Sequence, residues 1–171
     1  MPTIYLALGA NLGDRMQNLR AALRQLAPHI KLTRLSPVYE TEPWGIADQP
    51  RFLNMAVAAE TTLPPHALLH ALKHIEQNMG RTETIRYGPR VIDLDILLYD
   101  ARVVQTNDLE IPHPRLAERR FVLVPLNDIA PTLVHPCLKK AVQELLRALP
   151  DDDTVHLFPE SIALTAVQSS N

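Results

Sequence analysis

The sequence predicts an α+β fold in which an antiparallel sheet carries helices on one face. Several short segments alternate apolar with polar or small residues, and two longer segments repeat apolar residues at helical spacing. These segments come in the order strand, helix, strand, strand, helix, strand, followed by shorter elements. This order matches a split βαβ, ferredoxin-like arrangement. With 171 residues, 46% of them hydrophobic, the chain is long enough for one domain with a sizeable core.

Each expected element has a local reason in the sequence. A turn after the first strand ends with Asp14, which can cap the following helix, and Pro28 ends that helix. Pro37 interrupts the second strand, because proline has no N–H to donate to a neighbouring strand. A proline pair begins the second helix and Gly80 ends it. In chain order we expect a strand at 3–8, a helix between 14 and 28, strands at 31–40 and 52–61, a helix from 64 or 65 to 79, and a strand at 91–100.

The remaining third of the chain gives weaker signals. We expect a short strand at 103–105, an apolar and partly extended segment at 121–129, and a helix at 139–149. Residues 1–150 are therefore expected to form a single domain. Residues 151–171 begin with an acidic run and are mostly small and polar, so we expect this C-terminal tail to be weakly ordered.

Composition disfavours several classes of function. The net charge of −2 provides no general electrostatic footprint for nucleic acid or a membrane surface, although arginines cluster at 81–90 and 115–120. We find no signal peptide and no apolar run long enough for a membrane span. Cys137 is the only cysteine, which fits a reduced, cytoplasmic setting. We therefore expect a cytoplasmic protein with a focused anion site and without nucleic-acid or membrane partners.

The most informative motif is the segment 86–97, which reads RYGPRVIDLDIL. Asp93 and Asp95 lie two residues apart in an apolar strand, so both side chains project from one face, about 6.5–7 Å apart. The aliphatic residues between and around them face the core. Two ionised carboxylates at this spacing repel each other, and partial burial raises the free-energy cost of keeping both charged. A divalent cation resolves this repulsion, and Mg²⁺ prefers one or two carboxylates together with phosphates and water.

An Asp-X-Asp pair can also be ordinary solvated surface on an antiparallel strand, and for an isolated pair that is the more common outcome. Here the strand is apolar on both sides of the pair, and aspartate is a poor strand former. Arg86 and Arg90 flank the turn before the strand and add the planar, permanent charge that a polyphosphate would bind. The motif therefore predicts a Mg²⁺-nucleotide site on the face of the sheet opposite the helices, which would form an active-site cleft.

With this motif, the chain resembles the 6-hydroxymethyl-7,8-dihydropterin pyrophosphokinase family of folate biosynthesis. The resemblance runs from about Thr3 to about Pro136. Besides 86–97, the matching segments are 8–13, 48–54, 111–115 and 119–123. The resemblance implies transfer of the terminal pyrophosphoryl group of ATP to the pterin hydroxymethyl oxygen, with release of AMP. It implies ATP as co-substrate, two Mg²⁺ ions as cofactor and small molecules as the only partners of a monomeric enzyme.

The same resemblance assigns the site residues. Asp93 and Asp95 would hold the two Mg²⁺ ions, and Arg81 and Arg90 would clamp the phosphates, so these four are the expected catalytic residues. The expected ATP-binding residues are Lys73, Glu76, Arg81, Tyr87, Arg90, Ile96, His113 and Arg119. The expected pterin-binding residues are Thr41, Pro43, Trp44, Phe52, Asn54, Tyr87, Asp93 and Phe121.

The residue types suit this chemistry, since phosphoryl transfer needs positioning and charge neutralisation more than a covalent nucleophile. Asp108 and Glu110 depart from the family pattern near the nucleotide.

Two other classes of function stay open on the sequence alone. One is a nucleotidyl- or cyclase-type transferase, which would need a polynucleotide groove or a dimer interface. The other is an RNA-binding sheet, which would need exposed aromatic residues and a basic surface.

Overall fold

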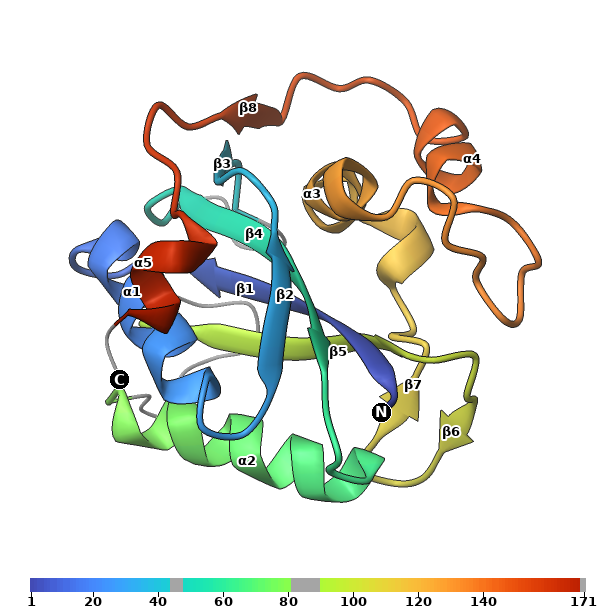
Figure 1. Cartoon of the computed structure of the whole chain (residues 1–171). Coiled ribbons are helices and arrows are strands. Elements are labelled where there is room, and N and C mark those ends of the chain that lie inside the picture. The colour runs from blue at the N-terminus through green and yellow to red at the C-terminus, as the bar shows by residue number, and fades with distance from the viewer. Residues whose placement is uncertain (44–47, 81–89, 170–171) are drawn as a thin grey trace.

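A six-stranded antiparallel sheet is the frame of the structure (Figure 1). The structure, a computed structural model, describes residues 1–43, 48–80 and 90–169. The strand order is β5-β1-β4-β3-β8, and β2 also pairs with β4. The strands of this sheet are β1 (Thr3–Ala10), β2 (Lys31–Leu35), β3 (Tyr39–Thr41), β4 (Phe52–Glu60), β5 (Asp93–Tyr99) and β8 (Val155–Leu157). The short strands β6 (Val104–Gln105) and β7 (Glu110–Ile111) form a separate hairpin.

Helices cover both faces of the sheet (Figure 1). The helices are α1 (Arg15–Leu26), α2 (Pro65–Asn78), a 3₁₀ helix (Leu116–Glu118), α3 (Arg120–Ile129), α4 (Val142–Arg147) and α5 (Leu164–Gln168). Residues from α1, α2 and α5 share the larger core with one face of the sheet. The smaller core lies between the other face and α3 and α4. None of the helices in the described segments has the length and apolar character that a membrane span requires.

Strand β4 shows how the sequence assigns side chains to the two cores. Leu53, Met55 and Val57 belong to the larger core, whereas the intervening Ala56 and Ala58 belong to the smaller one. Successive side chains of a strand point to opposite faces, so this alternation fixes which face meets which helices. The first four strands and both long helices occur where the periodicity predicts them, and the break around Pro37 separates β2 from β3.

Residues 121–129 correct one expectation. We expected this apolar segment to be partly extended, but it lies within helix α3 and contains Pro125. Its buried residues Val122, Leu123 and Leu126 lie at helical spacing and pack against the small alanines of β4. Helix α3 therefore covers part of the sheet face that we had expected to be open, and the cleft occupies the remainder. Tertiary packing of this kind can outweigh the cost of a proline inside a helix.

The structure describes the C-terminal tail as far as residue 169, and part of the tail packs on the domain. Strand β8 pairs with β3, and α5 packs beside α1 and β2. Ile162 and Val167 are buried in the larger core. The tail is mostly polar, but its few apolar residues are spaced so that they reach the core of the domain. Local composition does not reveal the long-range pairing of its strand.

We predict that Val167→Asp lowers the free energy of unfolding by about 2 kcal/mol, since it places an unpaired charge in a core position. The matched control is Val103→Asp, where the valine is already 53% exposed and the change should cost little. Urea unfolding of both variants and of the unsubstituted protein measures the difference. Equal stability of the two variants would show that α5 does not contribute to the folded domain.

Candidate active site

A cavity of about 380 Å³ opens on the sheet where β5, β1 and β4 lie side by side. The pairing of these strands aligns Asp93 of β5, Gly9 of β1 and Asn54 of β4 in one row. Directly paired residues of an antiparallel sheet project from the same face. An acidic group and an amide therefore stand on either side of a glycine, and all three line the cavity.

The floor of the cavity consists of small residues. Gly9 and its neighbour on the same face, Ala7, both line it. A Cβ atom built on Gly9 would lie 2.6 Å from Oδ1 of Asn54, which is closer than real Cβ contacts allow. Glycine at this position thus leaves space for the buried Asn54 side chain, and the short side chains of β1 keep the centre of the cavity open.

Two carboxylates form one wall of the cavity. Asp93 and Asp95 are both partly buried and both line it, paired with Gly9 and Ala7. They share one face of β5, as the i, i+2 spacing predicts, although β5 begins only at Asp93. The Nε atom of Arg90 lies 3.7 Å from Oδ1 of Asp93, and the Arg90 side chain is only 12% exposed. This wall thus combines the carboxylate oxygens of two aspartates with a mostly buried guanidinium group.

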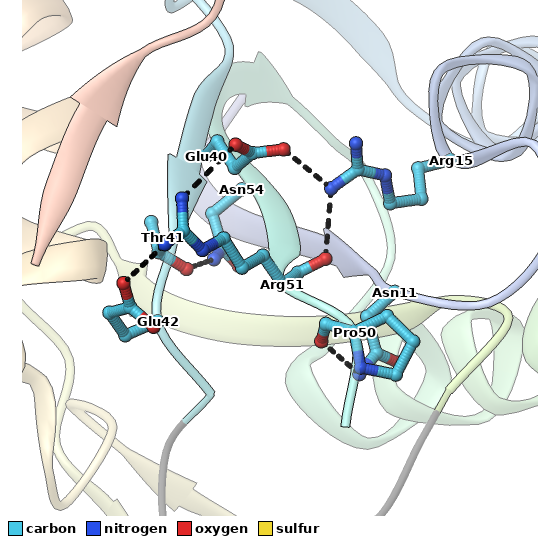
Figure 2. Close-up of polar contacts among 8 residues, drawn as sticks. All are labelled: Asn11, Arg15, Glu40, Thr41, Glu42, Pro50, Arg51 and Asn54. Carbon is cyan, nitrogen blue, oxygen red and sulfur yellow. Dashed lines mark hydrogen bonds and ion pairs between the residues drawn. The ribbon is translucent and has the colours of Figure 1, made fainter. Parts of the chain in front are cut away.

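Asn11, buried after the end of β1, connects the segments that lead into β4 and β5. Its side-chain oxygen accepts the backbone N–H of Arg90 at 2.7 Å, and its own N–H donates to the Arg90 carbonyl at 3.0 Å. Its amide nitrogen donates to Gln49 Oε1 at 2.9 Å. It also donates to the Pro50 carbonyl at 3.0 Å (Figure 2). A buried amide with all these partners fixes its neighbours firmly. Sequence analysis found Asn11 only as part of a matching segment.

The opposite wall carries the amide and the aromatic rings. Asn54 Nδ2 donates to Oγ1 of the buried Thr41 at 2.6 Å (Figure 2). Phe52 and Phe121 line the same cavity from β4 and α3. Arg119 stacks over the Phe121 ring, with 5.4 Å between its guanidinium carbon and the ring centre. A flat heterocycle could bind here between aromatic faces and use the amide for its polar edge.

A network of ion pairs holds the outer side of this wall (Figure 2). Arg15 of α1 lies 2.8 Å from Glu40, and it also donates to the Arg51 carbonyl at 3.0 Å. Arg51 in turn lies 3.1 Å from Glu42 and 3.7 Å from Glu40. The network ties α1, β3 and the start of β4 together. Glu42 also lines the cavity, and sequence analysis missed it because nothing in its local pattern distinguishes it.

The remaining cavity residues include Lys73 and the buried Glu76 of α2, and His113 after β7. Burial, followed by the nearby Arg119 guanidinium, lowers the pKa of His113 to about 4. Its Nδ1 accepts the backbone N–H of Arg115 at 3.2 Å, so the proton of the neutral ring is assigned to Nε2. His113 is thus a neutral donor at pH 7.

The structure places eleven of the sixteen predicted site residues around this cavity: Thr41, Phe52, Asn54, Lys73, Glu76, Arg90, Asp93, Asp95, His113, Arg119 and Phe121. Ile96 is buried and lines an adjoining cavity of about 360 Å³, together with Asp108 and Glu110. Pro43 lines a third cavity of about 140 Å³ beside Phe121. Arg81, Tyr87 and Trp44 lie outside the described residues. Ile96 lies within β5 and belongs to the larger core, on the face opposite Asp93 and Asp95.

The chain is similar in sequence to a well-defined group of proteins. A family model described as 7,8-dihydro-6-hydroxymethylpterin-pyrophosphokinase (HPPK) matches residues 5–131. The 2-amino-4-hydroxy-6-hydroxymethyldihydropteridine pyrophosphokinase of Aquifex aeolicus is 42% identical, covering 84% of this chain and 90% of the relative. The Bacillus subtilis protein of the same name is 49% identical, covering 73% and 76%. Folic acid synthesis protein FOL1 of Dictyostelium discoideum is 44% identical over 91% of this chain, which spans only 24% of that longer protein.

Solved structures support the same fold. The crystal structure of Plasmodium falciparum HPPK-DHPS with pteroate superposes with a TM-score of 0.72 and 19% identity, covering 85% of this chain and 42% of that one. Another HPPK-DHPS structure, in complex with substrates, gives a TM-score of 0.72, 18% identity, and coverage of 86% and 43%. The fold is therefore the α+β, ferredoxin-like fold that the sequence predicts. The extent of the family match and the identity to monofunctional relatives show that the chain belongs to the 7,8-dihydro-6-hydroxymethylpterin-pyrophosphokinase family.

Proposed function

We propose that this protein transfers the pyrophosphoryl group of Mg²⁺-ATP to the hydroxymethyl oxygen of 6-hydroxymethyl-7,8-dihydropterin. The hydroxyl oxygen attacks the β-phosphorus in line, the bond from that phosphorus to the α,β-bridging oxygen breaks, and AMP leaves. The hydroxyl proton is released in the same reaction. One observation carries the proposal: a single cavity has a carboxylate pair on one wall and an amide with two aromatic rings on the other. These two walls match the two substrates of the family.

The carboxylate wall fits a divalent cation. Among the residues in the described ranges, no cluster of three or more histidine, cysteine, aspartate or glutamate side chains exists. Mg²⁺ does not need such a cluster, because it commonly uses one or two carboxylates and completes its shell with phosphate oxygens and water. Asp93 and Asp95 would hold the two ions that we propose. When bound, these ions neutralise the negative charge of the triphosphate and orient it.

The chain's own cations and donors complete the phosphate side. Asn11 holds the backbone of Arg90, and Asp93 pairs with its guanidinium, so this cation stands beside the carboxylates before ATP arrives. Such preorganisation lowers the cost of stabilising charge that develops in the transition state. His113 adds a neutral Nε2–H donor, and Lys73 and Arg119 add positive charge around the cavity. We propose that Arg81 and Tyr87 act on the same phosphates, as the family resemblance implies.

The adjoining cavity is a candidate for the nucleoside part of ATP. It shares Lys73, Asp95 and His113 with the main cavity, so a triphosphate bound at the carboxylates could extend into it. Its lining includes Thr106, Asp108 and Glu110, which can accept hydrogen bonds from ribose hydroxyls or an amino group. We therefore propose that the departures at Asp108 and Glu110 alter the nucleoside contacts and leave the phosphate site intact.

The reaction itself can be tested by incubating the protein with Mg²⁺-ATP and 6-hydroxymethyl-7,8-dihydropterin. Phosphorus NMR should show AMP and a diphosphorylated pterin in equal amounts. Production of ADP, or AMP with free inorganic pyrophosphate and unmodified pterin, would reject the proposed transfer.

We predict that Asp93→Asn and Asp95→Asn each lower turnover by about 10³-fold or more, because the amide keeps the shape but loses the charge that holds the ions. The matched control is Asp100→Asn, just beyond the other end of β5, where the side chain accepts the backbone N–H of Thr3. Steady-state assays and thermal unfolding of all three variants separate a loss of catalysis from a loss of fold. Turnover within about tenfold of normal in either cavity variant would reject the metal assignment.

We predict that Asn54→Leu abolishes pterin binding and leaves ATP affinity unchanged, since the variant removes the amide that would bind the polar edge of the ring. Gly9→Ala should weaken pterin binding in the same selective way, because its Cβ would displace the Asn54 side chain. Calorimetric titration with each ligand measures both affinities. Unchanged pterin affinity in Asn54→Leu would remove Asn54 from the proposed site.

We predict that His113→Gln flattens the acid dependence of stability. The pKa of this histidine is about 4 in the folded protein and near its ordinary value of 6.5 when unfolded. Between these values the unfolded state binds more protons, so the folded protein loses about 2 kcal/mol of stability from pH 7 to pH 5 through this group. Urea unfolding at both pH values should show that His113→Gln lacks this loss. An equal loss of stability in both proteins would contradict the lowered pKa of His113. Burial also lowers the pKa of His135, but both proteins retain this residue, so its contribution is the same in each.

A further inference from the structure

The C-terminal tail contacts the segment that forms the pterin side of the cavity. Strand β8 pairs with β3 in a register that places Val155 opposite Thr41. The backbone N–H of Glu42 donates to the Thr154 carbonyl at 3.1 Å. Thr41 and Glu42 both line the cavity, and Thr41 accepts the hydrogen bond of Asn54. The family match ends at residue 131, so the tail lies beyond the region that defines the family.

The turn before β8 also contacts the start of α3. Oδ1 of Asp152 accepts the Thr154 hydroxyl at 2.7 Å and the Thr154 N–H at 3.3 Å, and these bonds fix the turn. The same oxygen lies 3.8 Å from Nε of Arg120, a buried atom without a hydrogen-bond partner in the described structure. Arg120 lies between Arg119 and Phe121, and both of these line the cavity.

The 140 Å³ cavity marks where these segments meet. Its lining combines Glu42, Phe121, Asp152 and Thr154, so the tail stands directly behind the pterin wall. The other ion pair to Arg120, from Asp151, spans 3.6 Å to a side chain that is 86% exposed. Exposed ion pairs contribute little to stability, whereas the strand pairing and the Asp152 turn consist of directional hydrogen bonds. The turn and β8 therefore carry the contact.

We propose that β8 and the Asp152 turn are positioning elements for the pterin site. They hold Thr41 of β3, the adjoining Glu42, and the end of α3 that carries Phe121. This inference rests on the proposed function, because it assigns that wall to the pterin. Strands β5 and β8 lie at opposite edges of the sheet, with β1, β4 and β3 between them, so the carboxylate wall is far from the tail pairing. Loss of the tail contact should consequently weaken pterin binding and leave ATP binding unchanged.

The test uses two tail variants of the full chain, Asp152→Ala and His156→Pro, with Asp151→Ala as the matched control. Asp152→Ala removes the acceptor that fixes the turn, and His156→Pro removes the β8 N–H that faces Glu40 of β3, because hydrogen-bonded pairs alternate along an antiparallel ladder. Each should raise the dissociation constant for 6-hydroxymethyl-7,8-dihydropterin by about fivefold or more, with the ATP constant changed by less than about twofold. Asp151→Ala should bind both ligands normally.

Amide hydrogen exchange at Glu42 gives a second readout that does not depend on catalysis. The Glu42 N–H should be protected in the unsubstituted protein and in Asp151→Ala, and should exchange faster in both tail variants. Normal pterin affinity in both tail variants, or an equal loss of pterin and ATP affinity, would overturn the inference. Failure of the unsubstituted protein to bind the pterin would instead reject the proposed function, while the exchange data would still report the tail contact.

Discussion

The small side chains of β1 are the constraint on which the site depends. Gly9 and Ala7 lie between the carboxylates of β5 and the amide of β4, so the sheet is hollow at that point on one face. Larger residues there would fill the hollow, and at Gly9 a Cβ would collide with Asn54. Two walls of different chemistry can thus face each other across the width of one strand, which brings the proposed phosphate site and the proposed heterocycle site into one cavity.

Partial burial of a carboxylate costs free energy unless a positive charge lies nearby. In this structure a cation held in place by hydrogen bonds lies beside the acidic pair. Arg90 lies beside Asp93, and Asn11 holds the Arg90 backbone through both its side chain and its own N–H. Because Asn11 also holds Gln49 and Pro50, the segment that leads into the pterin wall and the segment that leads into the carboxylate wall share one buried anchor. This arrangement links the geometry of the two proposed substrate sites.

Much of this organisation could be predicted from the sequence because strand and helix periodicities are local. The i, i+2 spacing of Asp93 and Asp95 was enough to place both on one face, and the resemblance led to Asn54 and Phe121 in the same cavity. Long-range packing was not accessible in this way. Helix α3 depends on the alanines of β4, and β8 depends on pairing with β3, so neither segment could be assigned from its own residues. Gly9 shows its importance only once Asn54 is placed beside it.

The number of metal ions bound in the presence of a nucleotide is a direct test of whether Asp93 and Asp95 hold two ions. Electron paramagnetic resonance can count bound Mn²⁺, a substitute for Mg²⁺, on the protein saturated with α,β-methylene-ATP, in which the bond to be broken is replaced by an inert one. We predict two bound ions per chain for the unsubstituted protein and fewer than two when either Asp93 or Asp95 is replaced by asparagine. Equal numbers of bound ions in all three proteins would contradict it.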